Sequence, residues 1–459
     1  MQKDQKGFLR AISWVPSLYF IEGLPYIMVN VVSVIFYKRM EVDLGDITLY
    51  TSLLYWPWVI KPIWSPFVDV IRTKKFWIIL TQAAMAVGFA GVALTLPMDN
   101  FFRYSLAMMW FLAFMSATHD VAADGFYMLG LKENLQAGFV GVRSFFYRIA
   151  MLTGQGALVV FAGRLEKEVS IVEAWQSVFF LLAGMLAVAA IYHWIAIPKI
   201  EENTPNLDTD QTEALIGEIG ASQGGISHEN DGRLTPVRQE NQSFGAIFKD
   251  VGKVLGTFFQ KDHIGLILAF LLLYRLGEAQ LGKVASPFLL DDRAVGGLGL
   301  DTEAVGYIYG TIGVVGLVAG GILGGLAAAW KGLKFWLWPM IIAINLPNLL
   351  YVYLAMVQPE SQFLVSICVA IEQFGYGFGF TAYMLYLIYV SDGPYKTAHF
   401  ALGTGLMALG MMVPGAFSGE IQQWLGYPKF FLWVVIATIP AFIIVYFLPL
   451  DPEFGKKRE

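Results

Sequence analysis

Twelve long apolar stretches constrain the fold of this chain more than any other feature. A helix needs about 20 apolar residues to cross the hydrocarbon core of a bilayer. Of the 459 residues, 56% are hydrophobic and 15% are charged, against about 25% charged residues in soluble domains. Because backbone polar groups cannot stay unpaired in lipid, each stretch must be a helix. The sequence predicts an all-α polytopic membrane protein with transmembrane helices at about 12–37, 46–69, 75–96, 101–128, 138–163, 175–197, 262–290, 301–328, 333–357, 361–390, 395–423 and 428–450.

The order of these stretches predicts two similar halves. Residues 1–197 and 261–459 each contain six of them. Residues 198–243 are polar and acidic, which is typical of a mobile linker. Apolar residues at i, i+3 and i+4 spacing in 244–260 predict an amphipathic helix on the membrane surface.

The distribution of lysine and arginine predicts the orientation of the chain. With both termini in the cytoplasm, most basic residues fall in inside segments, as the positive-inside rule requires. The first apolar stretch contains Glu22 and ends without a small-residue cleavage site, so we expect it to remain as a helix. The outside segments then hold only Lys38, Arg39, Arg103, Arg164, Lys167, Arg293 and Lys429.

Residues 115–128 (MSATHDVAADGFYM) place ionisable groups where lipid-facing residues are expected. Asp120 and Asp124 are four residues apart and share one face of a helix. Such groups in spanning segments usually face a protein interior or a water-filled cavity. The preceding residue, His119, is a pathway candidate or simply a packed histidine. This stretch is therefore a candidate functional site.

The hairpin between the fourth and fifth helices predicts two ion pairs. Measured from its turn near Asn134, Asp124 and Arg143 lie at similar depth, as do Asp120 and Arg148. We expect each aspartate to approach its arginine as a neutralising pair. These pairs are either permanent salt bridges or partners that exchange during transport.

Further charged or flexible positions lie on the first, seventh and tenth helices. Residues 22–26 (EGLPY) predict a broken segment that lines a cavity, or a proline kink that improves packing. Arg275 and Glu278 are three residues apart and can pair locally, and Lys283 follows on the same helix. Glu372 precedes an aromatic and glycine run (372–379) that either lines the cavity or faces lipid.

Charged positions on helices one, four, seven and ten indicate four repeated triplets of helices. This is the architecture of the major facilitator superfamily. In the eighth helix, Gly316, Gly320 and Gly324 form a row of small residues for close helix packing.

The turn after the second helix resembles the cytoplasmic gate motif of that superfamily. Asp69 and Arg72 belong to it, although Ser65 replaces the usual glycine, and Arg143 is a third gating candidate. Alternatively, Arg72, Lys74 and Lys75 are positive-inside anchors.

Several segments together resemble the AmpG-type anhydromuropeptide permeases of the major facilitator superfamily. The resemblance covers nearly all twelve helices, and its specificity comes from the joint order of the segments. They are 18–26 (LYFIEGLPY), 61–69 (KPIWSPFVD), 116–124 (SATHDVAAD), 147–154 (YRIAMLTG), 175–182 (WQSVFFLL), 272–278 (LLYRLGE), 372–383 and 397–402.

The resemblance implies a secondary transporter of the bacterial inner membrane. It would import N-acetylglucosaminyl-anhydromuramyl peptides by proton-coupled alternating access. Arg148, Arg275 and Lys283 would meet substrate carboxylates, and Asp120, Asp124 or Glu22 would carry the proton. The family positions that carry over are Gly23, Pro25, Tyr26, Asp120, Asp124, Arg148 and Glu372.

Departures from the family pattern lie near the expected cavity. They are His119 in place of the common glutamine, Lys283 in place of small or polar residues, Tyr376 and Phe378 within the glycine run, and the long acidic linker. They bear on the substrate more than on the fold, so a siderophore, an acetyl-CoA-like solute or an oligosaccharide is the alternative cargo.

An enzyme and a sensor are the two alternative classes of function. An enzyme using His119 and Asp120 would need a second ligand cluster or a nucleophile motif, which the sequence lacks. A sensor would signal through the acidic linker. We expect no enzyme, no cofactor or metal, no disulfide framework around the single Cys368, and no nucleic-acid partner. The partners are protons, a glycopeptide-like solute and the lipid bilayer around a monomer.

Overall fold

The computed structural model describes residues 8, 10–70, 72–131, 133–198, 252, 256–393 and 395–456. The regular secondary structure of these residues is helical, and they contain no β-strand. The first half comprises α2 (Val15–Ile27), the π-helical turn η1 (Met28–Val32), α3 (Ser33–Arg39), α4 (Leu44–Leu53), α5 (Trp56–Val70), α6 (Lys74–Thr95), α7 (Phe101–Gly130), α8 (Glu133–Met151), η2 (Leu152–Leu158), α9 (Val159–Leu165) and α10 (Ile171–Ala196).

The second half repeats this pattern of long and broken helices. It comprises α13 (Ile264–Leu273), α14 (Leu276–Leu290), the short turn η4 (Arg293–Val295), α15 (Thr302–Val305), η5 (Gly306–Gly313), α16 (Val314–Lys331), α17 (Leu333–Asn345), α18 (Asn348–Val357), α19 (Gln362–Ser391), α20 (Lys396–Leu425), α21 (Tyr427–Ala437) and α22 (Ile439–Phe447).

Eleven helical segments of the described chain are long and apolar enough to cross a membrane. The predicted second span, 46–69, is instead divided into α4 and α5 by a turn at Leu54 and Tyr55. Pro57 follows this turn, and a proline without an N–H is best placed in the first turn of a new helix. Together, α4 and α5 take the place of the predicted second span, the one of the twelve predicted spans that is absent from these eleven segments.

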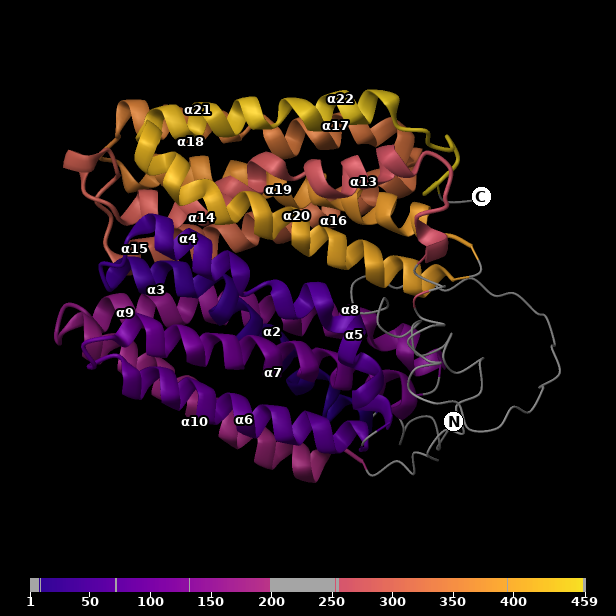
Figure 1. The fold of residues 1–459 in the computed structure, drawn as a ribbon, viewed down its shortest axis with the longest axis horizontal. Helices are drawn as coiled ribbons and strands as arrows, with labels where there is room; N and C mark the ends of the chain where they lie inside the picture. The colour runs from indigo at the N-terminus through magenta and orange to yellow at the C-terminus, as the bar shows by residue number, and fades with distance from the viewer. Residues whose placement is uncertain are drawn as a thin grey trace.

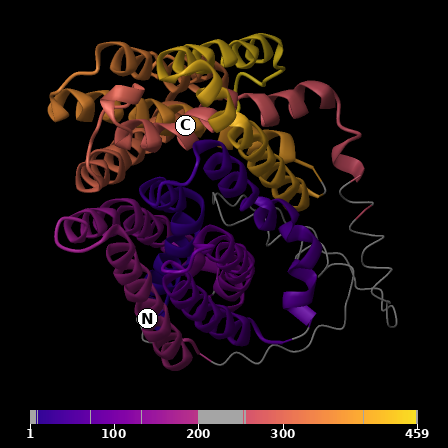
Figure 2. The same cartoon turned by 60° about the vertical axis from the view of Figure 1, so that its left-hand side comes forward.

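Two lobes lie side by side, α2–α10 in one and α13–α22 in the other (Figures 1 and 2). In the first lobe α6 packs against α7 and α10, and α2 packs against α8. In the second, α16 and α17 pack against α19, and α14 packs against α20. Between the lobes, α4 and α5 contact α20, α9 contacts α15, and η2 contacts η5.

Glycines allow the closest helix approaches. A Cβ at Gly320 would lie 2.1 Å from the carbonyl oxygen of Phe374, and one at Gly316 would lie 2.8 Å from that of Ala370. The predicted packing role of this glycine row is confirmed. At the contact between the lobes, a Cβ at Gly310 of η5 would lie 1.8 Å from the carbonyl oxygen of Gln155 in η2.

The first helix is not broken at Glu22–Tyr26. Helix α2 runs through Pro25, and the irregular turn η1 begins at Met28. A Cβ at Gly23 would lie 3.0 Å from Cβ of Ala150 on α8. These contacts agree with the packing alternative for this segment.

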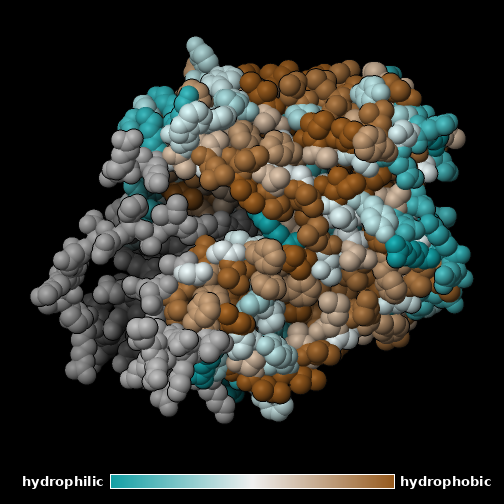
Figure 3. All heavy atoms as spheres, turned by 180° about the vertical axis from the view of Figure 1, so that it is seen from behind, coloured by the Kyte–Doolittle hydropathy of each residue, from teal (hydrophilic) through white to brown (hydrophobic). Residues whose placement is uncertain are grey.

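The surface of the described residues is suited to lipid. Large apolar side chains such as Val87, Ile195, Phe363 and Tyr446 are exposed. Seen from behind, a hydrophobic band covers both lobes, and hydrophilic residues gather at one end and in a crevice between the lobes (Figure 3). The predicted linker 198–243 and most of the predicted surface helix 244–260 lie outside the described residues, so the domain boundaries stay a prediction.

Candidate functional site

A lysine and an aspartate form a buried ion pair in the first lobe. Nζ of Lys61 on α5 lies 2.5 Å from Oδ2 of Asp120 on α7. The two side chains are 11% and 14% exposed. Solvent therefore screens this pair little.

Asp124, one turn further along α7, pairs with Arg143 on α8. The distance from Arg143 Nη2 to Asp124 Oδ1 is 2.7 Å, and the hydroxyl of Tyr19 donates to the same oxygen at 3.0 Å. The guanidinium also lies over the rings of Tyr19 and Tyr127, 4.2 and 4.6 Å from their centroids. The predicted approach of Asp124 to Arg143 is confirmed.

The predicted pairing of Asp120 with Arg148 is wrong. Asp120 binds Lys61, and Nη2 of Arg148 lies 3.9 Å from the Cβ position at Gly321 of α16, in the other lobe. Five residues separate Arg143 from Arg148, a rotation of about 140° around a helix with 3.6 residues per turn. Arg148 therefore points to a different side of α8 from Arg143.

Glu22 adds a third carboxylate to this cluster. It is buried on α2, and the charges of Asp120 and Asp124 repel it. Its Oε2 has no hydrogen-bond partner. The cluster of described residues thus holds three acids and two cations, Lys61 and Arg143.

His119 faces away from these acids and into the first lobe. Its Nε2 lies 2.9 Å from Nε2 of Gln82 on α6. Nδ1 of His193 on α10 lies 2.9 Å from Gln82 Oε1, and Nε2 of His193 lies 2.9 Å from Ser17 Oγ. Neighbouring residues on a helix differ by about 100° in direction, so His119 and Asp120 meet different partners. These contacts agree with the packed-histidine alternative.

Arg275 lies in the turn between α13 and α14. Its Nη2 donates to the hydroxyl of Tyr376 on α19, and its guanidinium is 4.8 Å from the ring centroid of Phe380. Arg275 forms no ion pair with Glu278, so the alternative that these two residues pair locally is not observed. The backbone at Arg275 is not helical (φ −107°, ψ 20°), which removes the i, i+3 geometry.

Lys283 reaches from α14 across to the first lobe. Its Nζ donates to Oγ1 of Thr51 at 3.0 Å and to the carbonyl oxygen of Asn30 at 3.3 Å. The ammonium also lies 5.4 Å from the ring centroid of Tyr55. This lysine is 6% exposed, and no carboxylate of the described chain lies within ion-pair distance.

Aromatic residues surround the meeting point of the lobes. The Tyr26 ring of α2 packs edge-on against Trp58, with centroids 5.1 Å apart, and against Tyr55 at 6.4 Å. Glu278 and Glu372 are buried deeper in the second lobe. The structure therefore places acidic candidates inside both lobes, whereas Lys283 and Arg148 each reach toward the opposite lobe.

The predicted gate residues have different surroundings. The side chain of Asp69 lies outside what the structure describes, and the exposed Arg72 lies over Phe76 at 5.7 Å. Lys75 donates to the carbonyl oxygens of Trp194 and Ile197 at 2.7 and 2.5 Å. This contact with the end of α10 supports the anchor alternative for Lys75.

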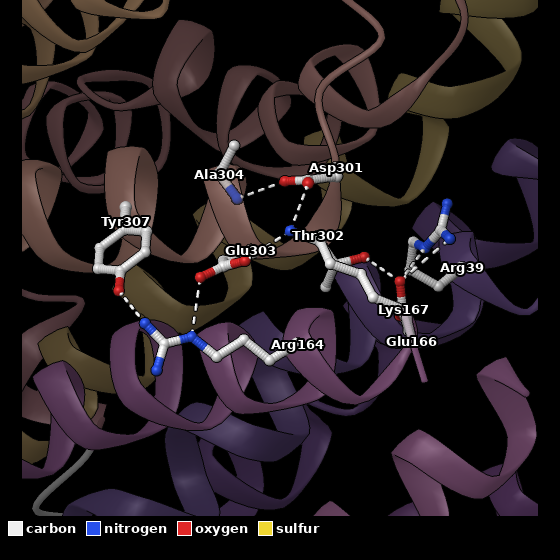
Figure 4. A network of polar contacts seen from close by, with 9 residues as sticks. All are labelled: Arg39, Arg164, Glu166, Lys167, Asp301, Thr302, Glu303, Ala304 and Tyr307. Atoms are coloured by element: carbon white, nitrogen blue, oxygen red, sulfur yellow. Dashed lines mark hydrogen bonds and ion pairs between the residues drawn. The ribbon is translucent and has the colours of Figure 1, made fainter. Parts of the chain in front are cut away.

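A polar network joins the lobes at the end of the molecule near α9 and α15 (Figure 4). Arg164 Nε donates to Glu303 Oε1 at 2.8 Å, and Lys167 Nζ lies 2.6 Å from Glu303 Oε2 and 3.1 Å from Asp301. Arg164 also donates to the hydroxyl of Tyr307 at 2.6 Å. Hydrogen bonds to Glu303 and Asp301 raise the pKa of Lys167.

Glu166 provides the less exposed half of this network. It accepts from Arg39 Nε at 3.1 Å and from Thr302 Oγ1 at 2.6 Å, and Trp175 Nε1 donates to its second oxygen at 2.9 Å. We call the residues Arg39, Arg164, Glu166, Lys167, Asp301, Thr302 and Glu303 the end network.

The Major Facilitator Superfamily profile matches residues 17–404. The chain belongs to this superfamily. The predicted fold class, two halves built from twelve spans, is confirmed in its all-helical, superfamily-type architecture. A solved structure of a D-xylose–proton symporter matches with a TM-score of 0.65 at 11% identity, covering 98% of this chain and 100% of that chain.

Curated relatives bear AmpG and permease names. A Rickettsia conorii protein named as transporter AmpG 4 is 25% identical over 444 residues, 94% of each chain. The anhydromuropeptide permease of Escherichia coli K12 is 23% identical over 433 residues, 93% of this chain and 77% of that protein. The resemblance to AmpG-type permeases is confirmed, and the chain is an integral membrane transporter rather than an enzyme.

Lys61 and the end network were not among the site residues predicted from the sequence. Lys61 stands in an apolar span, and a lone lysine there indicates a buried partner. The basic residues of the end network were expected only as outside charges, although Asp301 and Glu303 open the predicted eighth span with opposite charge. Complementary charge on two outside loops, one between the fifth and sixth spans and one between the seventh and eighth, is the pattern that could have indicated their contact.

Proposed function

We infer that this superfamily member imports anhydromuropeptides, N-acetylglucosaminyl-anhydromuramyl peptides, across the bacterial inner membrane. Proton-coupled alternating access is the proposed mechanism. The observation that carries the proposal is the acid-rich cluster of the first lobe, three carboxylates with two cations, in a chain whose curated relatives include an anhydromuropeptide permease.

Proton movement would begin in that cluster. Glu22 has an unpartnered oxygen beside two ion pairs, so the cluster can hold a proton without losing both pairs. Rearrangement of Lys61 or Arg143 would change which acid is ionised, because a nearby cation favours the charged form of a carboxylate. Such an exchange links the proton to a change in helix packing.

Substrate binding would use the cations that face between the lobes. Lys283 crosses from α14 to Thr51 and Asn30, Arg148 lies toward α16, and Arg275 is held among aromatic rings. A glycopeptide offers carboxylates to these cations and sugar rings to Tyr26, Trp58 and Tyr376. Apart from His119, the residues predicted from the sequence for the substrate and proton pathway thus carry charges or aromatic rings that suit this cargo.

The end network would act as the outer gate. With cytoplasmic termini, as the positive-inside pattern predicts, α9 and α15 face the periplasm (Figure 1). Their contact would hold that side closed while substrate leaves toward the cytoplasm.

Uptake by right-side-out membrane vesicles tests the proposal. Radiolabelled anhydromuropeptide should accumulate under an inward proton gradient, and a protonophore should abolish accumulation. Excess unlabelled muropeptide should compete, whereas a siderophore, acetyl-CoA and a free oligosaccharide should not. Vesicles with Lys283→Met should lose most uptake, and the matched surface variant Lys456→Met should keep it.

Two other outcomes would each contradict one part of the proposal. Competition by a siderophore, acetyl-CoA or an oligosaccharide in place of muropeptide would replace the cargo. Accumulation that withstands the protonophore would contradict proton coupling.

A further inference from the structure

A six-residue unit occurs at the same place in both halves of the chain. Residues 72–77 (RTKKFW) and 331–336 (KGLKFW) each begin with a basic residue and end with lysine, phenylalanine and tryptophan. Helix α6 begins at the third residue of the first unit, and α17 begins at the third residue of the second. Both units therefore lie where the third span of a half begins.

The aromatic side chains of the two units have the same arrangement. The ring centroids of Phe76 and Trp77 are 5.8 Å apart with an interplanar angle of 77°, and those of Phe335 and Trp336 are 5.5 Å apart at 78°. Both phenylalanines are exposed, and the indole nitrogen of each tryptophan is buried without a hydrogen-bond partner. Each lobe thus presents an exposed ring at this position.

The first basic residue of each unit lies over that exposed ring. The guanidinium carbon of Arg72 is 5.7 Å from the ring centroid of Phe76, and Nζ of Lys331 is 4.4 Å from that of Phe335. Lys331 also lies 4.4 Å from the ring centroid of Trp330, which is 69% exposed. These cation–π contacts position the ammonium group but do not neutralise its charge.

The two units differ in the lysine before the phenylalanine. In the first lobe, Lys75 donates to the carbonyl oxygens of Trp194 and Ile197 at the end of α10. In the second lobe, neither Lys331 nor Lys334 has a hydrogen bond or an ion pair to any side chain or carbonyl of the described chain. The second unit therefore keeps two positive charges for a partner from outside the protein.

The C-terminal tail packs against this second unit with its own charges paired. The carbonyl oxygen of Phe454 accepts a hydrogen bond from the backbone N–H of Leu333 at 2.9 Å. Nζ of Lys456 in the tail lies 2.5 Å from a carboxylate oxygen of Glu453, three residues before it. The described part of the tail thus leaves the charge of the two lysines unbalanced.

The second unit lies at the depth of the lipid headgroups. Lys331 is the last residue of the span Thr302–Lys331, and Lys334 is in the first turn of the span Leu333–Val357. Further along α17, the exposed side chain of Trp338 continues the apolar surface toward the middle of the membrane. This end of α17 lies toward the C-terminus (Figure 1), which the positive-inside pattern predicts to be cytoplasmic.

We propose that Lys331 and Lys334, with the rings of Trp330 and Phe335, form a site for the headgroup of an anionic phospholipid. The lipid phosphate would neutralise the two ammonium groups, and its acyl chains would cover the exposed apolar side chains of α16 and α17. A soluble phosphate would use the charges and leave the rings uncovered. The site involves no transported solute, so it does not depend on the proposed function.

Native mass spectrometry of the purified full-length protein measures this binding directly. Phosphatidylglycerol should bind the wild type more tightly than phosphatidylcholine with the same acyl chains. Lys331→Met/Lys334→Met should weaken phosphatidylglycerol binding about tenfold or more, because each basic residue near an anionic membrane surface contributes about fivefold. The matched control Lys429→Met removes an exposed lysine at the start of α21 and should bind phosphatidylglycerol like the wild type.

Two further measurements distinguish this site from a general attraction between charges. Phe335→Leu keeps both lysines but removes the ring, so it should weaken binding of phosphatidylglycerol severalfold and leave binding of phosphatidylcholine unchanged. Phosphatidylglycerol should raise the melting temperature of the wild type more than that of the double variant, and the two proteins should melt alike in phosphatidylcholine. If the double variant is unstable, Phe335→Leu still decides the question.

The inference fails if phosphatidylglycerol binds the wild type no more tightly than phosphatidylcholine, or if the double variant and Phe335→Leu both bind it like the wild type. An equal loss in Lys429→Met would mean that overall charge attracts the lipid. Displacement of phosphatidylglycerol by inorganic phosphate at the same concentration would make the ligand a soluble anion. Either of these last two results would also reject the phospholipid site.

Discussion

The pairing of Asp120 with Lys61 makes the two side chains interdependent. Asp120→Asn leaves the Lys61 ammonium buried and unpaired, and breaking one side of a buried pair costs about 3–5 kcal/mol. Asp120→Asn/Lys61→Met removes both charges and should recover most of that stability. Reaction of a thiol dye with the buried Cys368 during heating measures unfolding.

Uptake by the same variants distinguishes a structural pair from an exchanging one. If the pair exchanges partners during transport, the double variant melts near the wild type but carries less than a tenth of its uptake. Glu453→Gln, in the exposed Lys456–Glu453 pair, is the control and should change neither quantity, because surface pairs contribute about 0–1 kcal/mol. Wild-type uptake by the double variant would mean that the pair is static.

Helix α16 allows the same substitution to be made in two environments. A Cβ at Gly320 would meet the backbone oxygen of Phe374 at 2.1 Å, whereas one at Gly325 meets nothing within 4 Å. Gly320→Ala should force α16 away from α19 and destabilise the protein by about 1–3 kcal/mol. Gly325→Ala should be neutral or stabilising, because alanine is favoured over glycine in a helix by about 0.5–1 kcal/mol. Melting of both variants, followed at Cys368, checks this difference; equal melting temperatures would contradict it.

Some features of the helices could be predicted from the sequence alone, and others could not. Apolar runs of sufficient length predicted the spanning segments, and the spacing of Gly316, Gly320 and Gly324 predicted their packing side. The break between α4 and α5 was missed because a buried turn at Leu54 and Tyr55 leaves the run apolar.

The candidate site was predictable where helical geometry fixed it. Asp120 and Asp124 are four residues apart and therefore share one face of α7, and Asp124 pairs with Arg143 as predicted. The partner of Asp120 depended on α5, a helix whose position no local pattern specifies. The rotation of α8 about its axis, which directs Arg148 toward the other lobe, could not be predicted from a local pattern either. Contacts across a bundle are set by packing between segments that are distant in the sequence.

At the scale of the whole molecule, the end network joins lobes that must separate if access alternates. Each exposed ion pair contributes about 0.2–1 kcal/mol, so a few of them hold the end closed without locking it. Glu303→Gln removes the carboxylate shared by Arg164 and Lys167. The variant should therefore lower the ratio of closed to open molecules.

Spin labels across the end network measure that ratio. Val169, two residues after Lys167, and Val295, six residues before Asp301, are exposed on the two lobes, and the native Cys368 is buried. With cysteines at both positions, Glu303→Gln should add a longer-distance population, and high salt should increase the same population in the wild type.

Lys167 adds a pH dependence. Its pKa is raised by its hydrogen bonds to Glu303 and Asp301 in the closed state. Its contribution to closure is therefore fully present below the pKa that it has in the open state, and is lost as the pH rises through the raised pKa of the closed state. Closed molecules should therefore decrease in alkaline buffer in the wild type but less in Lys167→Met. An unchanged distance distribution in Glu303→Gln, at both salt concentrations, would mean that packing of η2 against η5 holds this end closed and the network does not.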